Sequence, residues 1–326
     1  MKAIAARIGQ AVGLILAVIV LNFILIRIAP GDAATAIAGS QSASDPELIA
    51  ELRTEYGLDR PFHVQLGTYI TDVLQGDLGT SIWFDEPVSS LLLDRVGPTI
   101  LLSAAALSFA VIMGVTLGTI AARKPDSLLS HIVTVVALVG YAMPAFWTGL
   151  LLLMFIGVKV SFFPVSGMHD VSFDGNWFES ILDIGQHLIL PALTLGIIYL
   201  AQYSRLSRAS MLEVLESDYI RTARAKGLSE RSVVFKHGLR NGVLPVVTIL
   251  GLQFGAVLSG AILVESVFAW PGLGRLAFEA VTRRDTPVLL GVLLLVSVSV
   301  ILANLATDLF YRIIDPRIRV SGARND

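Results

Sequence analysis

The chain has 326 residues, of which 54% are hydrophobic and only 15% are charged. A soluble globular chain usually carries about 25% charged residues, so this composition favours a membrane protein. The net charge of −2 gives no reason to expect nucleic acid or an acidic substrate as a partner. Because the sequence contains no cysteine, disulfides, thiolate catalysis and cysteine-ligated metals are excluded.

Long apolar segments recur along the chain, and a transmembrane helix needs about 20 predominantly apolar residues. Six segments meet this requirement, at 8–28, 98–121, 131–158, 187–206, 242–264 and 287–311. The first could instead be a cleaved secretory signal, since Lys2 and Arg7 precede it and Ala34-Thr35-Ala36 resembles a cleavage site. Its apolar run exceeds the roughly 15 residues usual for a signal, so we expect an uncleaved first span.

Basic residues in short loops set the expected orientation, because they favour the cytoplasmic side. Arg123 and Lys124 occupy one such loop. Another holds Arg205, Arg208, Arg221, Arg224, Lys226, Arg231, Lys236 and Arg240. Both loops should face the cytoplasm, and an even number of spans then places both termini inside. Arg283 and Arg284 lie outside in this topology, against the trend.

The segment 29–97 carries eleven acidic and three basic residues, which fits the outer face. Pro46, Pro61 and Pro87 each precede a stretch with apolar residues at helical spacing. We therefore expect a small helical cap on the outer side. The loop 159–186, rich in glycine, proline and acids, predicts a second and less regular outer element.

The stretch 216–242 predicts two short helices joined by a glycine turn. Ser217 or Asp218 can cap the first helix, and Gly227 is the residue type expected at a left-handed terminating position. Ser229 can cap the second helix.

Three interpretations of this loop follow from its residues. A basic loop centred on glycine can fit a groove on a cytosolic partner, or its arginines can anchor to anionic lipid headgroups. Two short helices with a glycine turn also occur in DNA-binding helix-turn-helix motifs. Because membrane spans hold both ends of the loop, we do not expect nucleic acid as a partner.

Three motifs in the sequence are more specific. They are Asp218-Tyr219-Ile220-Arg221-Thr222-Ala223-Arg224-Ala225-Lys226-Gly227-Leu228, followed by His237-Gly238-Leu239-Arg240-Asn241 and Pro245; Arg27-Ile28-Ala29-Pro30-Gly31-Asp32; and Glu265-Ser266-Val267-Phe268-Ala269-Trp270-Pro271-Gly272-Leu273-Gly274-Arg275. Together they resemble the dipeptide, oligopeptide and nickel permease family of ATP-binding-cassette (ABC) importers. The resemblance extends over essentially the whole chain.

The resemblance implies an all-α integral membrane fold, with the six transmembrane helices of a type I ABC importer permease and a small helical extracytoplasmic segment after the first span. Residues 1–97 would form the first transmembrane helix and this segment. Residues 98–312 would form a five-helix core with a cytoplasmic coupling loop at 207–241, and 313–326 a cytoplasmic tail. The protein would be a multi-pass component of a bacterial cytoplasmic (inner) membrane.

The function implied by the resemblance is ATP-driven import of di- or oligopeptides by alternating access, and nickel or another small solute is the alternative. The chain would pair with a second homologous permease, two ATPase subunits, an extracytoplasmic solute-binding protein and membrane lipid. ATP and Mg would bind to the ATPase chains and no cofactor to this one, which lacks the GxxxxGK[ST] motif. We therefore expect a transport subunit, not an enzyme.

The resemblance also implies two sets of functional residues. The ATPase-coupling loop would comprise Asp218, Tyr219, Arg221, Thr222, Ala223, Ala225, Lys226, Gly227, Leu228, His237, Arg240 and Asn241. The external gate candidates are Glu265, Phe268, Trp270, Pro271, Gly272 and Gly274.

No catalytic or metal site is expected, because the histidines lack metal-ligand spacing and should lie at the surface or at an interface. They are His63, His131, His169, His187 and His237. Polar residues within the spans should face a cavity or a protein partner. These residues are Gln253, Asn304 and Asp308. Two small-residue stripes predict close helix packing, Gly114 with Gly118 and Gly251 with Gly255.

Two other function classes fit the sequence less well. A secondary transporter would need no ATPase, but it would show inverted halves with broken helices and an ionisable site at the midplane. The spans here are mostly free of charge. A membrane enzyme would need convergent catalytic groups near the interface, and the sequence offers no such set.

Overall fold

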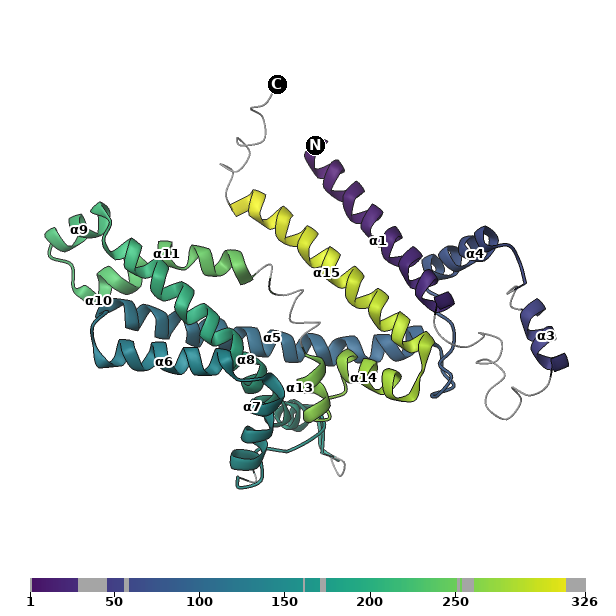
Figure 1. Cartoon of the computed structure of the whole chain (residues 1–326). Coiled ribbons are helices and arrows are strands. Elements are labelled where there is room, and N and C mark those ends of the chain that lie inside the picture. The colour runs from purple at the N-terminus through teal and green to yellow at the C-terminus, as the bar shows by residue number, and fades with distance from the viewer. Residues whose placement is uncertain are drawn as a thin grey trace. The chain divides into compact units, whose positions relative to one another are not determined.

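The computed structural model is built from helices over the residues that it describes, which are 2–28, 46–55, 59–160, 162–170, 174–250, 253 and 261–314. Four helices in these ranges are long and apolar enough to cross a membrane. They are α1 (Lys2–Ile28), α5 (Val88–Arg123), α8 (Trp177–Leu215) and α15 (Thr286–Ile314) (Figure 1). The predicted all-α membrane fold is confirmed.

The third expected span is not one straight helix. Helix α6 (Leu128–Ala142) is followed by α7 (Ala145–Leu152) and the π-helix η1 (Leu153–Gly157), and the two parts meet at an angle of 108°. Pro144 occupies the N-cap of α7 and has no N–H with which to continue the hydrogen-bond ladder of α6. The expectation of a continuous helix over 131–158 is therefore wrong, because a proline stands inside an otherwise apolar segment.

The fifth expected span, 242–264, lies partly outside the described residues, and the stripe of Gly251 and Gly255 lies wholly outside them. Residues 244–250 are helical. Gln253 forms a side-chain hydrogen bond with Tyr199 of α8, which gives this polar side chain the protein partner that its position required.

Helices α5 and α8 extend beyond the predicted ranges 98–121 and 187–206. At the start of α8, the Asn176 side chain accepts hydrogen bonds from the backbone N–H of Phe178 and Glu179. The Glu179 carboxylate accepts in turn from the Asn176 N–H, which completes a capping box. The prediction of a less regular element over 159–186 is therefore wrong for residues 177–186, which are helical.

The chain divides into two compact units, and the first consists of the described parts of 1–97 and 276–305. Helices α3 (Pro46–Glu55) and α4 (Phe62–Gln75) follow α1 in this unit. The ring of Phe23 on α1 contacts Phe62 and Tyr69 at centroid distances of 5.3 and 5.6 Å. The amphipathic helix predicted after Pro61 therefore forms and packs its aromatic face on α1.

The turn between α14 (Leu273–Arg283) and α15 belongs to the same unit and is held by a buried carboxyl group. Asp285 accepts a hydrogen bond from the Ser81 hydroxyl at 2.6 Å and from the backbone N–H of Trp83 at 3.2 Å. The guanidinium carbon of Arg283 lies 4.4 Å from the centre of a Trp83 ring. Arg283, one of the two arginines that oppose the expected charge trend, thus has a cation–π partner.

The second unit consists of the described parts of 98–275 and of 306 onward. Besides parts of α5, α14 and α15, its elements are α6, α7, η1, α8, α9 (Asp218–Ala225), α10 (Glu230–Ser232), the π-helix η2 (Val233–Gly238), α11 (Leu239–Gly242) and α13 (Ile262–Val267). Helix α8 packs against α6, α7 and α11, and α9 and α10 lie beyond its C-terminal end (Figure 1).

Glycines bring α5 and α8 into backbone contact. A methyl group added to Gly114 would lie 3.0 Å from the carbonyl oxygen of Leu200, and one added to Gly118 would lie 2.5 Å from that of Ser204. A methyl group on Gly196 of α8 would in turn lie 2.7 Å from the Phe109 ring of α5. The stripe of Gly114 and Gly118 therefore has the packing role predicted for it.

We predict that Gly118→Ala lowers the stability of the protein by about 1–3 kcal/mol, because the added methyl group overlaps the backbone of α8. Thermal unfolding in mild detergent measures this. Gly97→Ala is the matched control, since Gly97 lies on the same helix with no atom within 4 Å of an added methyl group. The control should be neutral or stabilise by roughly 0.5–1 kcal/mol. Equal unfolding temperatures for both variants would contradict the proposed contact.

Candidate functional site

The first candidate site is the segment 216–242, which follows the C-terminal end of α8 and covers most of the loop expected at 207–241, whose first residues belong to α8. This segment is called the coupling loop below. Ser217 occupies the N-cap position of α9, but its hydroxyl donates to the carbonyl of Val214 and makes no capping bond. Gly227 ends the first helix with φ +79°, the left-handed conformation predicted for it. Ser229 stands at the N-cap of α10, also without a side-chain capping bond.

The second helix of the loop is not a single α-helix. It runs from α10 through η2 to α11, so its middle is π-helical. Gly238 and Gly242 lie against Met211 of α8, where an added methyl group on either residue would contact the Met211 side chain. The absence of these two side chains allows the loop to approach α8 closely.

An apolar cluster anchors the coupling loop to the transmembrane helices. Ile220 and Ala223 of α9 are buried, as are Val233 and Val234 of η2. They pack with Ala122, Met211 and Leu215, which belong to the ends of α5 and α8. Full burial of a large aliphatic side chain contributes about 1.5–3 kcal/mol, so this cluster is the main source of the loop's stability.

The opposite side of α9 is exposed. Of the predicted coupling residues, Ala223 is buried and His237 is half-buried. The exposed ones are Asp218, Tyr219, Arg221, Thr222, Ala225, Lys226, Gly227, Leu228, Arg240 and Asn241. The structure also joins two residues that are distant in the sequence, since the Asn241 side chain donates a hydrogen bond to the Tyr219 hydroxyl at 2.8 Å. The loop therefore presents a polar, mixed-charge face outward from an apolar base.

A contact that sequence reasoning missed closes the turn around Gly227. The guanidinium of Arg224 donates to both carboxylate oxygens of Glu230, from Nη2 at 2.9 Å and from Nε at 3.2 Å. Arg224 Nη1 also lies 3.4 Å from the Leu215 carbonyl oxygen at the end of α8. The sequence offered one indication of this contact, because Arg224 and Glu230 carry opposite charges on either side of Gly227.

Arg224 holds the pKa of the Glu230 carboxyl below its ordinary value of 4.5, chiefly through their hydrogen bond and with a contribution from the positive charge of Arg123. Because the folded pKa is lowered, the stabilisation is complete above pH 4.5 and is lost as the pH falls through the lowered value. Both side chains are 42% exposed, so the pair contributes only about 0.2–1 kcal/mol. The pair therefore affects the geometry of the loop more than its stability.

The second candidate site surrounds Glu265, which is fully buried. Its carboxyl group accepts hydrogen bonds from the Thr99 hydroxyl at 2.8 Å and from the Arg275 N–H at 3.0 Å. The Thr99 hydroxyl accepts in turn from the Leu273 N–H at 2.8 Å. Trp270 donates from its indole to the Pro98 carbonyl at 2.9 Å. Thr99, Glu265, Trp270, Leu273 and Arg275 are together called the Glu265 cluster below.

The predicted gate residues are thus brought together, but they do not form an open surface. Glu265, Phe268 and Trp270 are at most 1% exposed. Gly272 contacts the Glu265 carboxyl group so closely that an added methyl group would overlap it. Thr99 was missed by sequence reasoning because 166 positions separate it from Glu265.

We predict that Thr99→Val destabilises the protein by about 1–3 kcal/mol, because it removes a donor from a buried carboxyl group and an acceptor from the Leu273 N–H. Thermal unfolding in detergent is again the measurement. Thr116→Val on the same helix is the control, since the exposed Thr116 bonds only within its own helical turn. A Thr99→Val variant as stable as this control would show that the hydrogen bonds contribute little.

The histidines include a buried exception to the expected surface placement. His187 is 5% exposed, and its Nδ1 lies 3.1 Å from Asp183. His169 Nδ1 lies 3.3 Å from the same carboxylate. Among the described residues, no group of three or more histidine, aspartate or glutamate side chains is arranged to hold a metal ion.

Comparison with family models accounts for nearly the whole chain. Residues 114–320 match the model described as "Binding-protein-dependent transport system inner membrane component". Residues 1–103 match the model "Binding-prot-dependent transport system membrane comp, N-term". The chain belongs to this family. The permease is accordingly a multi-pass inner-membrane protein and a transport subunit.

Several relatives of the permease are similar over nearly their full length. The di/tripeptide transport system permease protein DppB of Pseudomonas aeruginosa (strain UCBPP-PA14) is 43% identical over 97% of this chain and 98% of that protein. The dipeptide transport system permease protein DppB of Escherichia coli (strain K12) has the same identity and coverage. The glutathione transport system permease protein GsiC of Salmonella choleraesuis (strain SC-B67) is 44% identical over 94% of each chain.

Two solved structures have the same fold. An amino acid ABC transporter with histidines matches with a TM-score of 0.52 at 17% identity, over 69% of the permease and 94% of that chain. The inward-facing MetNI methionine ABC transporter matches with a TM-score of 0.54 at 18% identity, over 69% and 96%. The permease thus has the type I ABC importer fold, as predicted.

Proposed function

We propose that this permease is one transmembrane subunit of an ATP-driven importer of di- or oligopeptides, and that it works by alternating access. The observation that carries the proposal is the similarity, at 43% identity and over 97% of this chain, to permeases named for dipeptides and di/tripeptides. The glutathione permease adds a third relative whose named solute is a small peptide.

The orientation follows from the charge of the coupling loop. Basic residues in short loops favour the cytoplasmic side, so in this proposal the loop faces the cytoplasm and both termini lie there too. Helices α3 and α4, together with the Glu265 cluster, belong to the outer side. In this arrangement the long helix α8 extends from the outer face into the cytoplasm.

The exposed face of α9 is the docking element for an ATPase subunit in this proposal. The apolar base of this short helix holds it on its own chain, and its exposed polar, mixed-charge face can meet a partner surface of complementary charge. The loop carries acidic Glu216, Asp218 and Glu230 besides its basic residues, a mixture that fits a protein partner better than anionic lipid headgroups. The full importer would contain this permease, a second homologous one, two ATPases that bind ATP and Mg, and an extracytoplasmic binding protein.

The Glu265 cluster forms the rigid backing of the external gate in this proposal. Its carboxyl group ties α13 and the start of α14 to α5 through buried hydrogen bonds. Because Phe268 and Trp270 are buried, the cluster would shape the gate, while exposed neighbouring residues would contact the binding protein.

We predict that the permease, isolated in mild detergent from its own host, co-purifies with a second permease and with ATPase subunits. Mass spectrometry of the eluate identifies them. Import of labelled dipeptides by the purified complex in proteoliposomes, dependent on ATP and the binding protein, then tests the solute class. A transport-active permease recovered alone would instead indicate an ATPase-independent transporter.

We predict that Gly227→Leu abolishes most peptide uptake while the permease remains at normal abundance. The left-handed conformation costs a residue with a side chain about 1–2 kcal/mol, and relief of this strain would tilt α9. No atom lies within 4 Å of an added Cβ, so the effect comes from the backbone alone. Gly227→Asn is the control, because asparagine tolerates this conformation and should retain uptake. Normal uptake by Gly227→Leu at normal abundance would contradict the proposed need for a left-handed glycine at this turn.

A further inference from the structure

The turn between α9 and α10 lacks packing of its own. Gly227 and its neighbours Lys226, Leu228 and Ser229 are exposed, and no atom lies within 4 Å of an added Cβ at Gly227. Glycine is the residue with the greatest backbone freedom. If an ATPase moves α9, this turn could absorb the movement unless another contact resists it.

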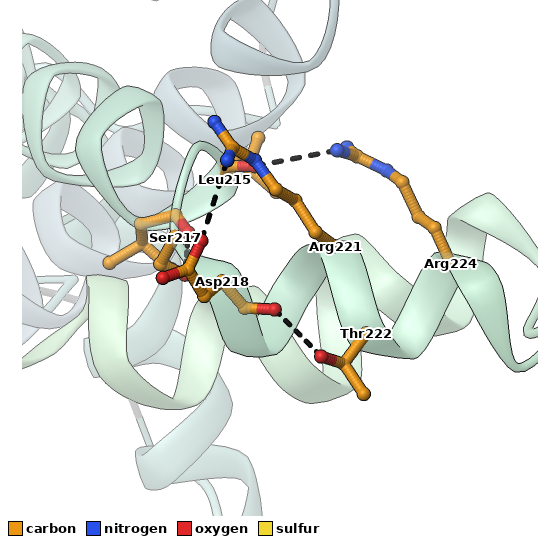
Figure 2. Close-up of polar contacts among 7 residues, drawn as sticks. Leu215, Ser217, Asp218, Arg221, Thr222 and Arg224 are labelled. Carbon is orange, nitrogen blue, oxygen red and sulfur yellow. Dashed lines mark hydrogen bonds and ion pairs between the residues drawn. The ribbon is translucent and has the colours of Figure 1, made fainter.

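Arg224 supplies that contact. Its side chain reaches from α9 to the carboxylate of Glu230 on α10 with two hydrogen bonds, and to the carbonyl oxygen of Leu215 at the end of α8. Figure 2 shows the Arg224 side chain directed back toward Leu215, on the side of α9 opposite to Thr222. One guanidinium group thus joins three helices that the chain connects only through two turns.

The chemistry of the three acceptor atoms, two on Glu230 and one on Leu215, suits arginine specifically. The planar guanidinium matches a carboxylate with two parallel donors, which fixes direction as well as distance. Its remaining N–H group points at the carbonyl end of α8, the negative end of the helix dipole. Lysine has a single ammonium group and cannot reproduce this fork. Both groups are charged at neutral pH, and the hydrogen bond from Arg224 lowers the pKa of the Glu230 carboxyl further.

The second arginine of α9 makes a different contact. Arg221 Nη1 lies 3.4 Å from Asp218, so its ion pair remains within one helix, and the side chains are 72% and 96% exposed. Figure 2 shows this pair beside the Arg224 contact. An intrahelical pair cannot set the angle between helices, whereas the Arg224 contact can.

We propose that Arg224 is a positioning residue, which with Glu230 locks α9 against α10 and the end of α8 so that movement of α9 is transmitted to α8. The inference rests on the proposed docking of an ATPase on α9. It assigns a transmission role to a side chain that lies beside the docking face and need not touch the ATPase.

The test measures peptide transport per ATP hydrolysed by the complete importer in proteoliposomes, together with the amount of co-purifying ATPase. Arg224→Gln and Glu230→Gln should each lower the ratio roughly three- to tenfold, the effect expected for residues within a coupling network. The ATPase should still co-purify, and ATP hydrolysis should continue. Arg224→Lys should also be impaired. Arg231→Gln, which removes one positive charge next to Glu230, is the matched control and should keep the wild-type ratio.

Reversible crosslinking tests the same contact within one protein sample. The chain contains no cysteine, so the double variant Arg224→Cys/Glu230→Cys adds its only two thiols. A short bifunctional methanethiosulfonate should restore the transport ratio when it bridges them, and a reductant should remove this gain. Monofunctional reagent is the control and should restore nothing.

The outcomes distinguish the two proposals. A lower amount of peptide transported per ATP hydrolysed, with the ATPase still bound, supports the positioning role if bridging restores that amount. Wild-type ratios in Arg224→Gln and Glu230→Gln, or a bridged protein no better than the unbridged one, overturn it. Absence of any ATPase from the wild-type complex would refute the docking proposal itself.

Discussion

The close approach of α5 and α8 positions both candidate sites. Gly114 and Gly118 allow the backbone of α8 to lie against α5, and Gly196 does the same in the opposite direction. Helix α5 carries Thr99 near one end and Ala122 near the other. At 1.5 Å per residue these positions are about 35 Å apart, close to the thickness of a bilayer. A single helix thus contributes to the Glu265 cluster on one side and to the base of the coupling loop on the other.

The two sites are stabilised in different ways. The Glu265 cluster is buried, and a buried carboxyl group is tolerated only while its hydrogen bonds are satisfied, so this region has one geometry. The coupling loop has an apolar base but an exposed turn and an exposed charge pair. The orientation of its exposed turn therefore depends on weak and directional contacts, on which the proposed positioning role of Arg224 rests.

Irregular helix geometry is concentrated where the described helices meet α8. The break before α7, the π-helix η1 and the π-helix η2 all lie in the second unit. Gly157 of η1 lies near Leu190 of α8, and Gly238 of η2 lies near Met211 and Leu215. Short π-helical segments commonly occur at functional positions in helical proteins. Here they adapt apolar segments to the surface of a long central helix.

The sequence by itself determined the membrane class, most of the helical segments and the left-handed glycine at position 227, because apolar length and the lack of a Cβ are local properties. Its motifs also singled out the loop 216–242 and the segment around Glu265 as candidate sites. The sequence could not predict the 108° angle between α6 and α7, nor the full length of α8. A proline can either break a helix, as Pro144 does, or lie inside one, as Pro191 does in α8.

Only the tertiary structure decided which residues meet. Thr99 and Glu265, or Tyr219 and Asn241, carry no signal of their pairing because the contacts depend on how separate helices pack. The role of Arg224 was undecided for the same reason: a basic residue in a loop can face lipid, a partner or its own chain. The fold selects the last option by placing Glu230 and the end of α8 within reach of one guanidinium group, at a distance fixed by the apolar packing beneath α9.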